Sequence, residues 1–142
     1  MKVSRDTIEI HTEEGQQFLD VTKSIQEIVD RSGVQNGLLL ITGLHTTIAL
    51  FINEFQSALL DDVASILQKL IPRGAGYFHD DPSYSDCDRA NAHAHLRATL
   101  LGRPIALGIA EGEILLGQYQ RVIMAELDGP RERRLQVQLV GE

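Results

Sequence analysis

The sequence contains little of what secreted or membrane-spanning proteins need. Cys87 is the only cysteine, so no disulfide can form within the chain and a disulfide scaffold is excluded. No apolar run approaches the ~20 residues that span a bilayer. The N-terminal segment also lacks the apolar stretch of a secretory signal. These absences predict a cytoplasmic protein with no membrane partner.

Basic residues are also few. The chain has 13 Lys and Arg against 20 Asp and Glu, which gives a net charge of −7 and a sequence pI near 5.2. Proteins that bind nucleic acids without sequence preference neutralise phosphates with basic side chains. We therefore expect no nucleic-acid partner, and the same surplus of acid disfavours docking on anionic membranes.

What is present is typical of a globular fold. The chain has 142 residues, of which 43% are hydrophobic, and it contains no repeat or low-complexity linker. This length corresponds to one domain, so we expect a single domain over residues 1–142.

Hydrophobic periodicity predicts the order of the elements. Alternating or continuous apolar runs predict strands, and three- to four-residue spacing predicts helices. The expected strands cover 7–14, 16–21, 37–43, 46–53, 104–110, 111–117, 119–129 and 133–142, with turns at Glu111-Gly112 and Asp128–Pro130. Helices are expected from Thr22 to Gly33, from Leu59 to Leu70 before Pro72, and from Asn91 to Gly102. The segment 37–43 is continuously apolar, which predicts a fully buried strand. This order has too few βαβ units for a parallel sheet and predicts an α+β fold with largely antiparallel sheets.

Four of the five histidines fall in turns, loops or helix starts. His45 lies between two expected strands, His79 in the polar loop 73–89, and His93 and His95 at the start of the last helix. Three imidazoles from separate segments are a common catalytic metal set that leaves one coordination position open. Helical positions two apart point about 200° away from each other, so His93 and His95 cannot both bind one ion. We therefore predict His45, His79 and His95 as metal ligands, with His93 either supporting a ligand from behind or facing the substrate. The alternative is that these are solvated turn histidines.

Carboxylates and arginines supply further candidates. Glu54 follows a strand and Asp86 closely precedes the histidine helix, so both are candidate acid–base groups beside His93. Arg121 and Arg131 are candidate phosphate contacts, because guanidinium binds phosphate with two hydrogen bonds. The alternative for Arg131 is a solvated arginine in a turn, and the alternative for Asp86 is a solvated carboxylate in a loop.

Several segments together resemble the YjbQ-like family over nearly the whole chain. They are "GLLLITGLHTTIALFINE", "ANAHAHLRATLLG", "EGEILLGQYQRV" and "AELDGPRERRLQVQLVGE". The resemblance implies a β-sandwich-like α+β fold, a homotrimer, and a histidine cluster that holds a divalent ion, with zinc expected before magnesium. By match to the family's motifs it also implies a substrate-binding role for Thr46, Thr47, Asn91 and Gln120, and it extends to the segment Glu126–Arg131. The family usually has tryptophan where this chain has Tyr119.

Members of that family are often described as secondary thiamine-phosphate synthases. The resemblance therefore implies an enzyme that joins a hydroxymethylpyrimidine diphosphate to a thiazole phosphate and releases pyrophosphate. Because three imidazoles suit zinc better than magnesium, the synthase reaction is expected to be a side activity. The alternatives are a zinc-dependent hydrolase and a non-catalytic metal- or ligand-binding trimer.

Overall fold

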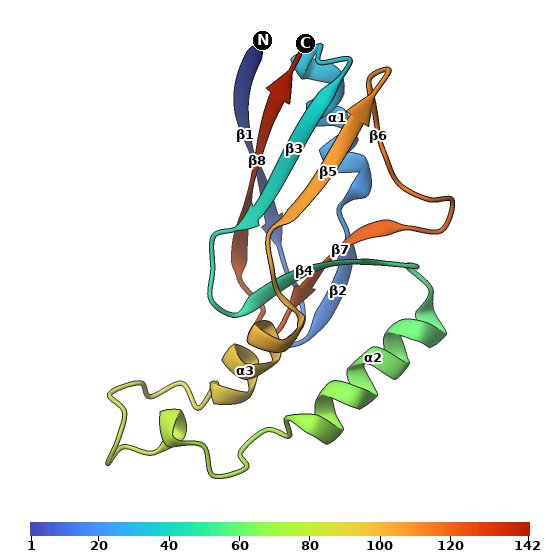
Figure 1. Cartoon of the computed structure of the whole chain (residues 1–142). Helices are drawn as coiled ribbons and strands as arrows, with labels where there is room; N and C mark the ends of the chain where they lie inside the picture. The colour runs from blue at the N-terminus through green and yellow to red at the C-terminus, as the bar shows by residue number, and fades with distance from the viewer.

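Two antiparallel sheets form the body of the protein (Figure 1), seen in a computed structural model that describes all 142 residues. The larger sheet has the strand order β1 (Lys2–His11), β8 (Glu132–Gly141), β3 (Gly37–Gly43), β5 (Ile105–Ala110) and β6 (Glu113–Ile114). The smaller sheet has the order β2 (Gln17–Asp20), β7 (Arg121–Glu126) and β4 (Ile48–Asn53). Every pair of neighbouring strands is antiparallel. The predicted α+β class is confirmed.

Three helices accompany the sheets. They are α1 (Thr22–Ser32), α2 (Ser57–Leu70) and α3 (Ala92–Leu101), and a short 3₁₀ helix η1 (Phe78–Asp80) lies between α2 and α3. Helix α1 ends as predicted at Gly33, whose φ of +73° is the left-handed conformation that favours glycine at a helix end. None of the helices is long and apolar enough to cross a membrane.

The main core lies between the inner face of the five-stranded sheet, α1 and the three-stranded sheet. Leu39 and Ile41 on β3, Ile25 on α1 and Met124 on β7 all belong to this one cluster and are almost completely buried. A second, smaller core, with Ala49, Leu67 and Ala98 among its members, joins α2 and α3 to β4 and β7. The helices α2 and α3 are thereby held at one end of the molecule, below β4 in the view of Figure 1.

The prediction that segment 37–43 is fully buried is wrong in detail. Strand β3 is buried on one face only, since Leu38 and Leu40 remain 64% and 44% exposed on the outer face of the sheet, which no helix of this chain covers. The apolar face of α2 is also only partly buried. Leu60 and Leu67 are buried, whereas Leu70 and Ile66 are 64% and 53% exposed. A continuous apolar pattern indicates the element, but not how much of it another layer covers.

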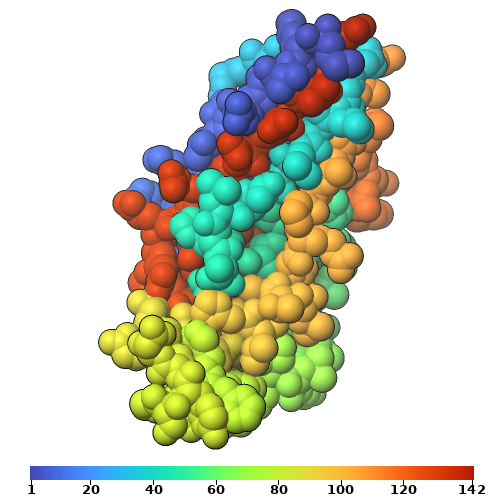
Figure 2. Space-filling model, turned by 60° about the vertical axis from the view of Figure 1, so that its left-hand side comes forward, coloured from blue at the N-terminus to red at the C-terminus, as the bar shows by residue number.

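The polar segment 73–89 folds around η1 rather than lying free. The backbone N–H groups of Asp80, Asp81, Tyr84 and Ser85 all donate to backbone oxygens within the segment. Figure 2 shows these yellow-green residues gathered at one end of the molecule, next to the yellow start of α3. His79 is in this way brought beside the histidine helix.

Candidate active site

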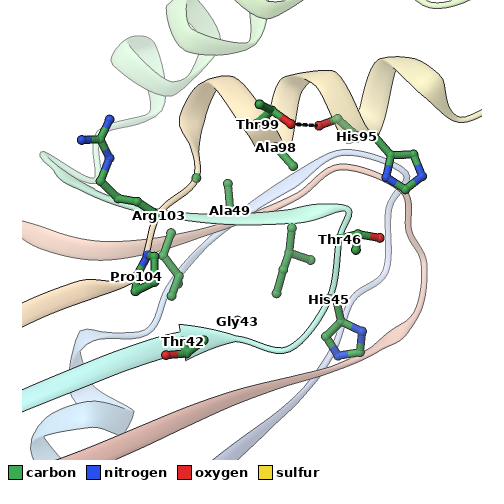
Figure 3. A pocket seen from close by; sticks show the side chains of 13 residues that line it. Thr42, Gly43, His45, Thr46, Ala49, His95, Ala98, Thr99, Arg103 and Pro104 are labelled. Atoms are coloured by element: carbon green, nitrogen blue, oxygen red, sulfur yellow. Dashed lines mark hydrogen bonds between the residues drawn. The ribbon is translucent and has the colours of Figure 1, made fainter.

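A cavity of about 440 Å³ lies between the β3–β4 turn and α3 (Figure 3). Its polar lining comes from three segments and consists of Thr42, His45, Thr46, His95, Thr99 and Arg103. His45 and His95 lie at one end of the cavity and Arg103 at the other. The volume is within the range of small-molecule sites, and the lining combines imidazole, hydroxyl and guanidinium groups.

A hydrogen bond from strand β8 holds the ring of His45, which lies on the β3–β4 turn. Its Nε2 accepts a hydrogen bond of 3.0 Å from the backbone N–H of Arg134, the residue that follows Arg133 on the neighbouring strand β8. Burial lowers the pKa of His45, and the positive charges of Arg133 and Arg134 lower it further. The neutral ring therefore carries its proton on Nδ1, which can act as a hydrogen-bond donor.

Helix α3 supplies His95 to the same cavity. The helix is held at its start by the Asp80 carboxylate, whose Oδ1 accepts a 2.9 Å bond from the N–H of Ala92. Burial lowers the pKa of His95, and the neighbouring His79 lowers it further. The rings of His79 and His95 lie 4.7 Å apart between centroids and are inclined at 55°. The pair from the loop and the helix is therefore in contact.

The predicted three-imidazole metal set is not assembled within one chain. Nowhere do three His, Cys, Asp or Glu side chains gather closely enough to hold one ion. His79 Nδ1 and Asp80 Oδ2 have no hydrogen-bond partner, and His79 Nδ1 lies 3.8 Å from the other carboxylate oxygen, Asp80 Oδ1. His45, however, already uses Nε2 in the bond from Arg134. The donor set of a single chain does not fit a three-histidine site as it stands, and metal binding by His45, His79 and His95 stays a prediction.

His93 and His95 line different cavities, as their two-residue spacing requires. His93 is only 8% exposed and lines a second cavity on the other side of α3, together with Arg97 and Asp128. Burial lowers the pKa of His93, followed by the charges of Arg97 and Arg73. Its Nδ1 has no hydrogen-bond partner. His93 thus does not share the cavity of His45 and His95.

The other candidate residues are spread over the molecule. Thr46 lines the cavity, but Thr47 is buried and accepts a 2.8 Å bond from Arg133. Asn91 and Arg131 both hold the carboxylate of Asp128, at 2.8 and 3.3 Å. Neither lines the histidine cavity.

The remaining candidates lie farther from the histidines. Gln120 and Arg121 line a separate surface cavity next to α1, where Arg121 pairs with Asp20 at 2.7 Å. Glu54 and Asp86 are exposed and outside the histidine cavity. The structure therefore does not bring these two carboxylates to the predicted metal ligands.

Sequence reasoning missed Thr42, Thr99 and Arg103 in the cavity lining. Thr99 lies four residues after His95 on the same helix, so helical spacing could have placed it on the same face. Arg103 follows the helix end, and no motif distinguishes it from a solvated arginine.

Comparison with known proteins gives a consistent picture. The profile of the family described as UPF0047 protein YjbQ-like matches residues 6–142. This chain belongs to the YjbQ-like family. A UPF0047 protein of Methanothermobacter thermautotrophicus is 36% identical over the whole of this chain and 95% of its own length. Another from Archaeoglobus fulgidus is 40% identical over 84% of this chain and 87% of its own.

Solved structures of similar proteins share the fold. A YbjQ-like protein of unknown function from Sulfolobus solfataricus has a TM-score of 0.91 at 34% identity and covers 99% of both chains. A hypothetical protein from Aeropyrum pernix has a TM-score of 0.88 at 33% identity, covering 98% of this chain and 99% of its own. The YjbQ-like fold is thus shared at full length, and the names of these relatives assign no activity.

Proposed function

We propose that this YjbQ-like protein is an enzyme that acts on small phosphorylated molecules in the cavity of His45 and His95. The reaction proposed is formation of thiamine phosphate from a hydroxymethylpyrimidine diphosphate and a thiazole phosphate, as a side activity of this site. The observation that carries the proposal is that His45 and His95, from separate segments, line one cavity together with Arg103.

The chemistry of this reaction suits such a lining. The ring nitrogen of the thiazole attacks the methylene carbon of the pyrimidine, a C–N bond forms, and the C–O bond to the diphosphate breaks with its electron pair. The departing diphosphate gains negative charge, which N–H donors and a guanidinium stabilise. Neutral His45 offers Nδ1–H, and Arg103, exposed at the other end of the cavity, supplies a permanent positive charge. No step is assigned to a metal ion.

The test is product formation by the full chain. The purified protein is incubated with both substrates, and thiamine phosphate and pyrophosphate are quantified by chromatography. Replacing one positioned hydrogen-bonding histidine, as in His95→Gln, is expected to lower kcat/KM about 100-fold. His11→Gln is the matched control, since His11 is exposed and lies on β1 outside the cavity. The proposal fails if wild type makes no product or if both variants are equally active.

A second candidate is a divalent-metal function centred on His79 and His95. It is favoured by the contact between these two rings and by the orphaned atoms His79 Nδ1 and Asp80 Oδ2. Zinc is the metal expected for imidazole ligands, and a zinc-dependent hydrolase or a non-catalytic binding trimer would both need it.

Elemental analysis of wild type, His79→Ala and His11→Ala tests this second candidate. Loss of zinc in His79→Ala alone would support it, whereas equal metal content in all three would remove it. Consumption of one substrate and water, without pyrophosphate synthesis from two substrates, would favour the hydrolase over the synthase.

A further inference from the structure

The second cavity, on the other side of α3, contains a buried arginine without a counter-ion. Arg97 is only 5% exposed, and its side chain makes no ion pair with any carboxylate. Its N–H groups donate instead to neutral oxygens, at 2.8 Å to Gln16, at 3.0 Å to Gln68, and at 2.9 and 3.0 Å to the carbonyl of Ile71. One N–H of Nη1 is left without an acceptor. A buried charge that lacks an anionic partner is costly, so this arrangement calls for an explanation.

The carboxylate that lines the same cavity is already neutralised. Asp128 accepts bonds from Arg89 at 3.2 Å and from Arg131 at 3.3 Å, and a further bond from Asn91 at 2.8 Å. It is therefore not free to compensate Arg97. Asp80, the other acid near His93, holds the start of α3 through its bond from Ala92.

Arg73 adds a second unpaired positive charge. It lines the cavity, is exposed, and makes no hydrogen bond or ion pair with the protein. Around this cavity Arg73, Arg97 and the two partners of Asp128 outnumber the carboxylates, although the chain as a whole carries a net charge of −7. His93 completes the lining as a buried side chain whose Nδ1 has no partner.

We propose that this cavity is a second ligand site that binds the phosphate group of a small polar molecule between Arg73 and Arg97. The cavity measures about 310 Å³, and only one of its nine lining residues is hydrophobic, which suits a compact anion rather than an apolar ring. Two guanidiniums match a doubly charged oxyanion, which each can contact with paired N–H groups. The Gln16 and Gln68 side chains fix the fork of Arg97 in advance. The site is separated from the histidine cavity by α3 and does not depend on the proposed activity.

Calorimetric titration of the full chain with inorganic phosphate, at constant ionic strength, tests the site. Because the Arg73 side chain makes no hydrogen bond or ion pair within the protein, Arg73→Gln should leave the fold intact and weaken phosphate binding about ten-fold or more, the loss expected for a charge-assisted contact. The matched control is Arg5→Gln, which removes the same charge from an exposed position on β1. Equal weakening in both variants would overturn the proposal, because it would show a non-specific charge effect.

Amide chemical shifts locate the bound phosphate. Shifts at Gly15, Gln16 and Gly129 are expected, since these residues line the second cavity. Shifts confined to Thr42, Thr46 and Arg103 would place the phosphate in the histidine cavity and overturn the proposal.

Two further arms test the ligand class and Arg97. Succinate at the same concentration should not displace phosphate; equal displacement would show a general carboxylate site instead. Arg97→Lys keeps the charge but loses the fork and its bonds to Gln16, Gln68 and Ile71. A lower unfolding temperature is therefore expected, and at temperatures where the variant is folded it should bind phosphate more weakly than wild type. Unchanged affinity in this folded variant would refute the role of Arg97.

Discussion

Replacing Arg133 by methionine should be among the most damaging single changes to this fold. The side chains of Arg133 and Glu126 are 1% and 0% exposed. Glu126 Oε1 accepts hydrogen bonds from Arg133 Nε at 2.8 Å and from the Thr12 hydroxyl at 2.7 Å. Removal of the guanidinium leaves a buried carboxylate without its counter-ion, which typically costs about 3–5 kcal/mol. That is a large share of the ~5–15 kcal/mol by which a domain is stable.

Urea unfolding followed by circular dichroism measures the loss, at one fixed protein concentration so that any assembly contributes equally. The control is Arg31→Met, which breaks an exposed pair with Asp6 whose side chains are 62% and 42% exposed. Such surface pairs contribute about 0–1 kcal/mol. The cost of Arg133→Met should shrink as the pH falls, because Glu126 can then become neutral. If both variants lose the same small amount of unfolding free energy, the buried pair of Arg133 and Glu126 does not stabilise the fold by more than a surface pair does.

Three further predictions concern stability and assembly. Burial lowers the pKa of His45, His93 and His95 below the usual value of 6.5, so the unfolded chain binds more protons than the folded one. The free energy of unfolding should therefore decrease as the pH drops below about 6.5. A free energy of unfolding that stays constant between pH 7 and 5 would contradict this. Gly37→Ala should unfold at a markedly lower temperature than Gly15→Ala, since an added Cβ would come 2.2 Å from the Val140 oxygen in the first case and no closer than 3.8 Å to any atom in the second. We also propose that the protein is a homotrimer in which the exposed outer face of β3 contacts a neighbouring copy. Light scattering should then give three times the chain mass for wild type and a smaller mass for Leu38→Lys. A wild-type mass of 15.7 kDa, that of one chain, would refute the proposal.

The order of elements could be predicted because local signals agree with tertiary packing. Helix α1 follows three-residue apolar spacing up to Gly33, and Glu111-Gly112 forms the expected turn with φ values of +52° and +80°. The short β6 shows the limit of this reasoning. Only Glu113 and Ile114 pair with β5, although the apolar pattern continues to Leu116. Pairing depends on the neighbouring strand, about which a local pattern carries no information.

The candidate site could be predicted only in part. Helical geometry correctly separates His93 from His95, because two residues of helix reverse the direction of a side chain. The distance between His45 and the pair of His79 and His95 depends on how the β3–β4 turn and the loop 73–89 pack against α3. Residue spacing along the sequence does not predict this packing. Arg97 was missed for the same reason: its lack of a carboxylate partner is a property of the folded surroundings.

In the proposed function, His45 and His95 bind one common ligand. Nitrogen-15 spectra of the histidine rings, recorded while hydroxymethylpyrimidine diphosphate is added, test it most directly. The imidazole signals of His45 and His95 should shift together along one saturating curve, while that of the exposed His11 stays in place. If the signals of His45 and His95 do not shift at saturating ligand, or shift no more than that of His11, the cavity does not bind this substrate and the proposed function is wrong.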